Sequence, residues 1–423
     1  MKKWFFFTIL VVCFVFSGTS IFAAGQVEEG PKALPEKIVV GCIEPFTGSY
    51  AVFGTEAKIG MEIAIQHINE SGGIVSLGGI PLELVSEDSG ESPDTAKLAT
   101  ESIISKHQPV AILGLYISRQ TIPASEVTDR NEVILVADAL VDSLTAMGRR
   151  YVFRPSANAG QYGASAVEFI VDMVKKTGIA MDEIAIISED SAFGHSVAMG
   201  AANAALANGM TIIYQKEYPY DLSDATSIVS DISNFRADVV FHCPYFMDAI
   251  LFAKAFRESG KTPKFIAGMG ACGYVDDNSI EALGDTVNAY TNTYGYNPEM
   301  DTPANKKFVK AFRAQTGNLP TDSSGMNYYG MWTLKEALEL SGKMFPEDPL
   351  NPENLRTAFI NLDITTGPAA ETYPTQHISF TETGDNPHAR AVVMQVINGQ
   401  PKVVWPFAGA EVEPIFPRED ASY

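Results

Sequence analysis

The sequence has few cysteines and lacks the short motifs of common enzyme and cofactor sites. Four cysteines occur in 423 residues, without the close spacing of a zinc site or a disulfide framework. There is no Gly-x-Ser-x-Gly, no Gly-x-x-x-x-Gly-Lys-Ser/Thr phosphate loop and no His-Glu-x-x-His. No two of the six histidines have the spacing of metal ligands on one helix face. We therefore expect no metal, no cofactor and no catalytic residues.

Long apolar runs are absent after the first few residues. The chain starts with two lysines, continues with an apolar run at Trp4–Phe16 and then turns to small residues up to Ala24 and Gly25. This order predicts a secretory signal peptide over residues 1–25, because a membrane span needs a longer apolar run. Cys13 lies inside the run and is preceded by a valine, so we do not expect a lipid anchor.

Basic residues are scarce relative to acidic ones. The chain carries 30 Lys and Arg against 51 Asp and Glu, for a formal net charge of −21. Removal of the two lysines of the leader leaves 28 basic residues and a net charge of 28 − 51 = −23. A surface of that sign repels phosphate backbones, so nucleic acid is not expected as a partner.

One glycine motif and one cysteine pair leave alternatives open. GMGACG at 268–273 fits Gly-x-Gly-x-x-Gly, but the next expected strand ends in Asn292 where a dinucleotide site needs an acid. We interpret the motif as a tight turn. Cys42, Cys243 and Cys272 remain after the leader, an odd number, and are expected as buried free thiols. A bridge between Cys243 and Cys272 is the alternative, since both follow expected strands.

Alternation of apolar strands and amphipathic helices organises the chain. Runs such as IVVGC (38–42), VAILG (110–114), EIAIIS (183–188) and ADVVFHC (237–243) predict buried parallel strands, each followed by a helical pattern. After VAILG we expect a short polar loop, Tyr116 to Gln120, and a helix from about Thr121. TVNAYT (286–291) is expected as a strand, and residues 302–361 as three helices.

The fold class is therefore α/β, with two doubly wound parallel-sheet lobes and a ligand cleft between them. The late helices need a sheet to cover, so the chain crosses between lobes three times, near 157, 292 and 383. We expect residues 26–157 and 292–382 in the N-terminal lobe, and 158–291 and 383–423 in the C-terminal lobe. His67 is expected on a helix surface.

Several motifs together resemble one family. They are EPFTGSYAVFG, KIGMEIAIQHINESGGI, LVSEDSGESPDTA, GLYISRQTIPASEV, YVFRPSANAGQYG, EDSAFGHS and GACGYVDDNSIEALGD. In order and spacing, from about residue 37 to 406, the chain resembles the extracytoplasmic solute-binding proteins of branched-chain-amino-acid-type ABC importers. These are type I periplasmic binding proteins with the leucine-binding-protein fold.

The resemblance implies a set of ligand-binding residues at the strand ends. Ser118 matches the serine that holds the ligand carboxylate in the family. The family's threonine is lost from the next loop, and Met269 replaces the acid that meets the ligand ammonium. The full expected set is Phe53, Tyr116, Ser118, Asp138, Ala139, Leu140, Phe193, Tyr245 and Met269.

Loss of that acid should remove most selectivity for α-amino acids, because a buried ammonium group needs a carboxylate partner. We therefore expect either a modified amino acid or a partly apolar carboxylate without an α-amine. Asp138 could supply a substitute charge, or it could pair with Arg119 and leave the site neutral.

By this resemblance the chain is a binding protein, not an enzyme. It would capture a small molecule outside the cytoplasm, close on it as a monomer and deliver it to a membrane permease that works with an ATPase. The alternatives are a ligand-sensing receptor module of the same fold and, last, an exported α/β enzyme.

Overall fold

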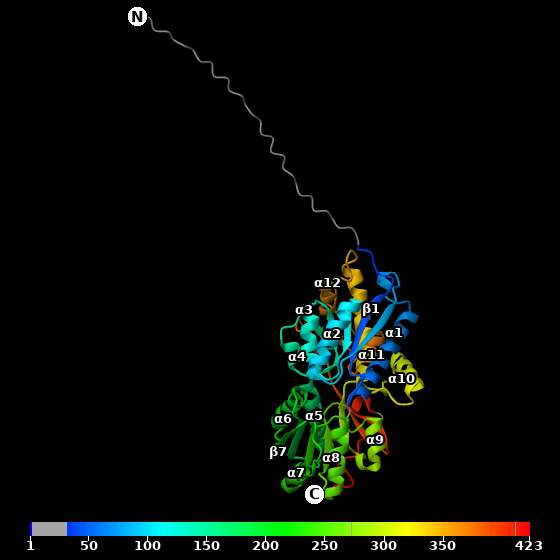
Figure 1. Ribbon diagram of the computed structural model, residues 1–423. Coiled ribbons are helices and arrows are strands. Elements are labelled where there is room, and N and C mark those ends of the chain that lie inside the picture. The colour runs from blue at the N-terminus through cyan, green and yellow to red at the C-terminus, as the bar shows by residue number, and fades with distance from the viewer. Residues whose placement is uncertain (2–31, 272, 411) are drawn as a thin grey trace.

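The structure is a computed structural model that describes residue 1 and residues 32–271, 273–410 and 412–423. Two lobes lie end to end, and each has a central sheet between helices (Figure 1). The expected leader, residues 1–25, lies outside the described residues apart from Met1. No helix among those described is both long and apolar enough to span a membrane.

The first lobe is built on a five-stranded parallel sheet in the order β2-β1-β3-β4-β5. Helices α2 and α3 pack together on one face, and α1 packs with the later helix α11. The elements are β1 (Ile38–Glu44), α1 (Ala51–Glu70), η1 (Val75–Leu77), β2 (Leu82–Asp88), α2 (Pro93–His107), β3 (Ala111–Gly114), α3 (Ser118–Arg130), β4 (Ile134–Ala137), α4 (Ser143–Ala146) and β5 (Val152–Phe153).

The second lobe has a seven-stranded sheet in the order β14-β13-β10-β9-β8-β6-β7. Strands β7, β6, β8, β9 and β10 are parallel, whereas β13 and β14 add antiparallel at one edge. The elements up to β10 are α5 (Ala159–Thr177), β6 (Glu183–Glu189), α6 (Ala192–Ala207), β7 (Thr211–Tyr218), α7 (Thr226–Phe235), β8 (Val239–Cys243), α8 (Phe246–Ser259), β9 (Phe265–Gly268), α9 (Asp277–Leu283), η2 (Gly284–Val287) and β10 (Thr291–Tyr294).

The last third of the chain contributes to both lobes. Helix α11 packs on α1 and β3 of the first lobe, and β13 and β14 complete the second sheet. The chain therefore passes between the sheets after β5, after β10 and before β13. Residue 292, near which the second crossing was expected, lies within β10. These elements are α10 (Pro303–Thr316), α11 (Asp322–Met344), α12 (Pro352–Ile360), β11 (Asp363–Ile364), α13 (Gly367–Glu371), β12 (Ile378–Ser379), β13 (Val392–Ile397), β14 (Gln400–Trp405) and η3 (Phe407–Gly409).

The α/β fold class and the three helices expected within 302–361 are confirmed. The strand expected at 286–291 is wrong, because a 3-10 turn occupies its first half and β10 begins only at Thr291. The loop expected from Tyr116 to Gln120 is also mostly helix. α3 begins at Ser118 and accommodates Pro123 inside.

Two smaller expectations have different outcomes. His67 is not on the surface: it is buried, and its Nδ1 lies 3.0 Å from the Tyr328 hydroxyl of α11. It lies on the side of α1 that packs against α11. Cys42 and Cys243 are buried free thiols. Cys272, the other half of the possible bridge, lies outside the described residues.

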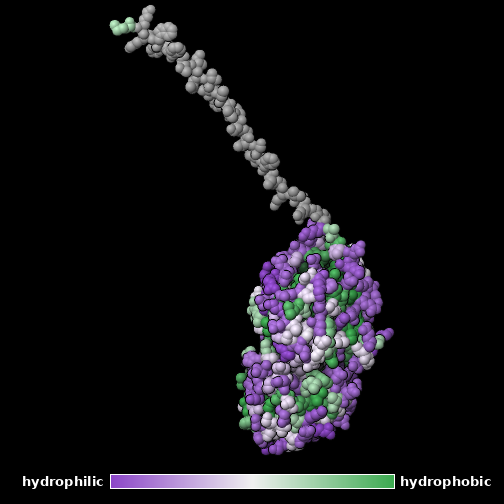
Figure 2. Space-filling view, in the orientation of Figure 1, coloured by the Kyte–Doolittle hydropathy of each residue, from purple (hydrophilic) through white to green (hydrophobic). Residues whose placement is uncertain are grey.

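The surface agrees with the acidic, charged composition. Figure 2 shows hydrophilic residues over most of the visible face of both lobes, with hydrophobic residues in separate patches between them. Among the exposed large apolar side chains are Val52 at the start of α1 and Met247 at the start of α8. These two helix ends face the region between the lobes (Figure 1), where the functional site is found.

A backbone-to-backbone contact sets the packing of α1 on α11. A Cβ placed on Gly60 of α1 would lie 2.2 Å from the carbonyl oxygen of Ser324 on α11, closer than atoms can approach. Only glycine therefore permits this helix crossing. The contact also sets the position of the first turns of α1, which carry residues of the cleft wall.

Gly60→Ala should lower the free energy of unfolding by about 1–3 kcal/mol through overpacking. Helix propensity alone would favour alanine by about 1 kcal/mol, so the two effects have opposite signs. The denaturant midpoint measures the result. Gly409→Ala is the matched control, because its added Cβ meets no atom within 4 Å. An unchanged or higher midpoint for Gly60→Ala would show that the helices are not in close contact.

Candidate functional site

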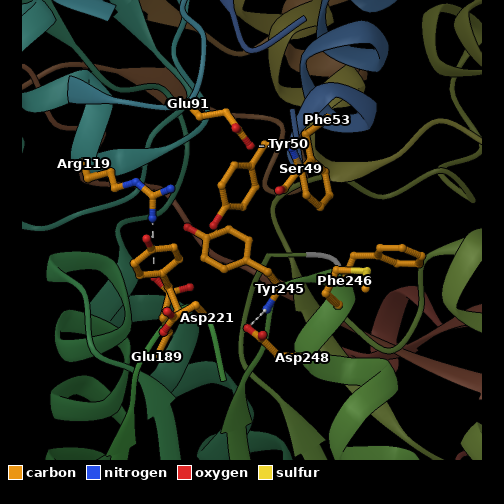
Figure 3. Close-up of a pocket in the computed structure, with 12 residues that line it drawn as sticks. Ser49, Tyr50, Phe53, Glu91, Arg119, Glu189, Asp221, Tyr245, Phe246 and Asp248 are labelled. Atoms are coloured by element: carbon orange, nitrogen blue, oxygen red, sulfur yellow. Dashed lines mark hydrogen bonds and ion pairs between the residues drawn. The ribbon is translucent and has the colours of Figure 1, made fainter. Parts of the chain in front are cut away.

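A cavity of about 340 Å³ lies between the two lobes (Figure 3). The first lobe contributes the start of α1, the loop after β2 and the start of α3. The second lobe contributes the end of β6, the loop after β7 and the start of α8. The lining residues are Ser49, Tyr50, Phe53, Glu91, Arg119, Glu189, Tyr220, Asp221, Tyr245, Phe246, Met247 and Asp248.

Aromatic rings from both lobes meet in the cavity wall. The ring of Tyr50 lies edge-on to that of Tyr245 with centroids 5.4 Å apart, and Phe53 lies 6.4 Å from the same ring. A second layer supports them: Tyr116 stacks on Phe53 at 5.0 Å, and Phe193 lies 5.8 Å from Tyr245. Contacts of this kind stabilise the pair of lobes in the closed arrangement.

Helix starts hold these side chains in position. Asp248 in the first turn of α8 accepts a hydrogen bond from the backbone N–H of Tyr245, at 3.2 Å. The Tyr218 hydroxyl donates to the same carboxylate at 3.4 Å. Across the cleft, Glu91 accepts from the backbone N–H of Ser49 at 2.6 Å. Helix N-termini favour such carboxylates because their first amides have no partner within the helix.

Arg119 is the single basic residue in the cavity lining and connects the lobes. Its Nη1 lies 4.0 Å from Oε1 of Glu189 at the end of β6. Its guanidinium carbon lies 5.2 Å from the ring centres of both Tyr50 and Tyr220. These are cation–π distances, so one side chain of α3 contacts three groups, two of them in the other lobe.

The acids of the cavity are incompletely neutralised. Burial, and next the negative charge of Asp248, raise the pKa of Glu189 to about 7. Burial also raises the pKa of Asp248 to about 6. Glu91 and Asp221 add two more carboxyl groups against the one guanidinium of Arg119. The cavity therefore has aromatic walls, one cation and an excess of negative charge near neutral pH.

The comparisons with known proteins agree on a family. The sequence pattern described as "Periplasmic binding protein" matches residues 37–401. The Leu/Ile/Val-binding protein homolog 8 of Brucella melitensis biotype 1 is 30% identical over 379 residues, which cover 86% of this chain and 90% of the relative. The chain belongs to the periplasmic binding proteins of the Leu/Ile/Val-binding type.

Solved structures share the fold of this periplasmic binding protein. The leucine-binding protein LivK of Thermotoga maritima has a TM-score of 0.73 at 22% identity, covering 86% of this chain and 97% of LivK. A solute-binding protein of an R. palustris ABC transporter, solved with benzoate, has a TM-score of 0.73 at 18% identity, covering 92% and 99%. The family and fold are those of extracytoplasmic substrate-binding proteins rather than enzymes.

Two of the nine expected ligand-binding residues line the cavity of this binding protein. They are Phe53 and Tyr245. Tyr116 and Phe193 form the second layer behind them. The remaining five are buried and do not belong to the cavity lining: Ser118, Asp138, Ala139, Leu140 and Met269. A direct ligand contact by these five stays a prediction.

The other ten lining residues were not expected as ligand contacts from the sequence, and Arg119, Glu189 and Tyr50 are among them. The alternative in which Asp138 pairs with Arg119 is wrong, because Arg119 faces Glu189. A signal for Glu189 was present: it is the last residue of a strand, where α/β sheets bind ligands. A signal for Arg119 was its place next to Ser118 in the polar loop expected after VAILG.

Asp138 instead belongs to a buried acid pair below the cavity. Its Oδ2 accepts from Nδ2 of Asn327 at 2.6 Å, and Oε2 of Glu44 accepts from the backbone N–H of Tyr116 at 3.1 Å. Oδ1 of Asp138 and Oε1 of Glu44 are buried without a donor among the described residues, and a proton shared by the two carboxyl groups would satisfy both. Burial raises the pKa of Asp138 to about 7, and it raises the pKa of Glu44 well above its usual value. The described residues contain no group of three or more metal-ligating side chains.

The acid pair predicts a pH dependence of stability. Asp138 has a raised pKa, so the folded protein keeps a proton that the unfolded chain loses from about pH 4 upward. The stability from this group is therefore fully present below about pH 4 and is lost as the pH rises to about 7. The slope is at most about 1.4 kcal/mol per pH unit for one proton.

Asp138→Asn should flatten this profile between pH 5 and pH 7, because an amide can donate to Glu44 without a shared proton. Denaturant midpoints across that range measure the effect. Asp301→Asn, at an exposed ion pair with Lys306, is the matched control and should keep the wild-type slope. Equal slopes for all three proteins would contradict the shared proton.

Proposed function

We propose that this chain is the substrate-binding component of an ABC importer. It captures a small amino-acid-like or partly apolar carboxylate ligand between its lobes and delivers it to a membrane permease that works with an ATPase. One observation carries the proposal: the cavity is walled by both lobes, with Arg119 and aromatic rings in its lining. A ligand in such a cavity contacts both lobes only when they are closed.

The side chains of the cavity suit the two parts of such a ligand. The rings of Tyr50, Phe53 and Tyr245 provide an apolar surface against which aliphatic or aromatic groups of the ligand can pack. The guanidinium of Arg119 can bind a carboxylate through two parallel hydrogen bonds. Its ion pair with Glu189, at 4.0 Å, is longer than a hydrogen bond, so a ligand carboxylate can compete for it.

The relatives support this range of ligands. Substrate-binding proteins of the same fold have been solved with isoleucine and with leucine, and others with benzoate and 3,4-dihydroxybenzoic acid. A carboxylate is common to all four compounds, whereas an α-amine is present in two. Arg119 supplies a partner for the shared group.

Closure would follow from differential affinity. A ligand shifts the balance between open and closed lobes only by binding the closed form more tightly. The contacts of Tyr50 with Tyr245 and of Arg119 with Glu189 already join the lobes without a ligand. A bound molecule adds contacts to the same closed arrangement. Ser118 and Asp138 stay expected contributors below the cavity, Ser118 for an anionic group and Asp138 for a cation or hydroxyl.

Tyr245→Ala should weaken ligand binding at least tenfold, because its ring forms the central wall and contacts rings from both sides. Native mass spectrometry of protein from its own cells would first identify the bound molecule, and calorimetry would then measure it with isoleucine and benzoate for comparison. Tyr214→Ala, an aromatic residue of β7 that packs on Phe235 outside the cavity, is the control. Equal affinities for both variants and wild type would show that the ligand does not bind in this cavity.

Arg119→Met should cost about 1.5–3 kcal/mol in the affinity for a carboxylate ligand through loss of the charged hydrogen bonds. Arg119→Lys keeps the charge but not the planar fork, so it should restore only part of the affinity. Calorimetry with the methyl ester of the same ligand is the control, because the ester should be insensitive to both substitutions. An unaltered carboxylate affinity in Arg119→Met would refute this role.

A further inference from the structure

A second chamber continues from the cavity on the side of α8. It has a volume of about 230 Å³ and shares Ser49, Phe53, Phe246 and Met247 with the first cavity. The residues that only the second chamber adds are Val52, Asp276 and Asn278. Figure 3 shows the shared side chains of Ser49, Phe53 and Phe246 on the side of the cavity opposite Arg119.

The wall of the second chamber is mainly apolar and comes from both lobes. Val52 and Phe53 belong to α1, and Phe246 and Met247 begin α8. Val52 is 46% exposed and Met247 is 62% exposed, so their apolar surfaces face water in the absence of an occupant. An alkyl or aryl group placed between them would remove that surface from water on both sides.

Asp276 places a carboxylate in this apolar wall. The residue is only 3% exposed. Its Oδ1 accepts hydrogen bonds from the backbone N–H and the side-chain amide of Asn278, both at 2.9 Å. Its Oδ2 is buried and has no hydrogen-bond partner among the described residues. A buried carboxylate oxygen without a donor is unfavourable, and an ammonium group is the partner that would satisfy it best.

No basic side chain lines the second chamber. Two acids interact electrostatically with Asp276: Glu56, which accepts from the Thr321 hydroxyl at 2.8 Å, and Asp277, on which Arg313 also acts. Burial raises the pKa of Asp276 and brings that of Glu56 to about 8. Glu56 is therefore mostly protonated at pH 7, and the carboxyl group of Asp276 has no basic side chain beside it in the chamber lining.

We propose that the second chamber binds the ammonium group and apolar stem of an amine-bearing ligand, with the ammonium paired to Oδ2 of Asp276. The inference rests on the proposed function and specifies the end of the ligand that Arg119 does not contact. The ligand class is an elongated primary amine whose apolar stem lies between α1 and α8. The remaining polar end lies in the first cavity.

Three probes of equal length test the proposal by calorimetry at pH 8: hexylamine, hexanoate and hexan-1-ol. Hexylamine should bind at least ten times more tightly than hexanoate, with hexan-1-ol between them. Asp276→Asn should remove this preference, because the amide keeps the helix cap but has no charge. Asp301→Asn, which removes one exposed charge outside both chambers, should leave it unchanged.

A second variant covers the case in which Asp276→Asn does not fold. Met247→Lys changes an exposed side chain and places an ammonium group in the same chamber. Hexylamine affinity should then fall at least tenfold, and hexanoate affinity should rise. Equal binding of hexylamine and hexanoate to the wild type, or a hexylamine affinity that neither substitution alters, would overturn the proposal.

The outcome separates this inference from the proposed function. If the naturally bound molecule depends on Tyr245 and Arg119 but hexylamine binding is independent of Asp276, only the second chamber is wrongly assigned. If no small molecule binds between the lobes, the proposed function fails and the inference fails with it.

Discussion

Carboxyl groups buried without a cation are the constraint on which the cleft depends. Removing an ionised carboxylate from water is unfavourable unless hydrogen bonds, a proton or an opposite charge replace its hydration. Burial raises the pKa of both Glu44 and Asp138, and Asn327 donates to Asp138. Asp322 at the start of α11 accepts from the backbone N–H of Gly295, in the segment that follows β10. The hydrogen bond from Asn327 to Asp138 links α11 to the loop after β4, and that from Gly295 to Asp322 links α11 to the segment after β10.

Arg154, a fully buried cation, is satisfied by several acceptors at once. Arg154 follows β5 and has no exposed surface. All three nitrogens of its guanidinium group donate hydrogen bonds. It donates to the carbonyl oxygens of Leu140 and Val141 at 3.0 and 2.7 Å, to the Thr145 hydroxyl and to Oδ1 of Asp385. The loop after β4 is thereby tied to the segment that leads into β13. This network occupies the carbonyl oxygens of Leu140 and Val141 within the protein.

The sequence predicted the architecture well because parallel strands buried on both faces are nearly continuous apolar runs, and the helices between them have clear starts. Ser92 before Pro93 is an example, with its hydroxyl accepting from the Thr95 N–H at 3.1 Å. The local sequence pattern did not predict burial where a segment distant in the sequence covers a residue. His67 was expected on a helix surface, but α11, more than 250 residues later, covers it. The positions of the charged residues in the cleft have the same cause, since Arg119 and Glu189 meet only when the lobes do.

The replacement of an acid by Met269 therefore does not remove negative charge from the cleft. An alignment compares one position at a time, and at that position the partner for an ammonium group is lost. In the folded chain, Glu189 at the end of β6 and Asp276 just before α9 both face the space between the lobes. Glu189 has Arg119 nearby, whereas Oδ2 of Asp276 has no partner among the described residues. In the proposed assignment the ammonium group of the ligand therefore lies at Asp276, and such a ligand is longer than one whose charges share a single carbon atom.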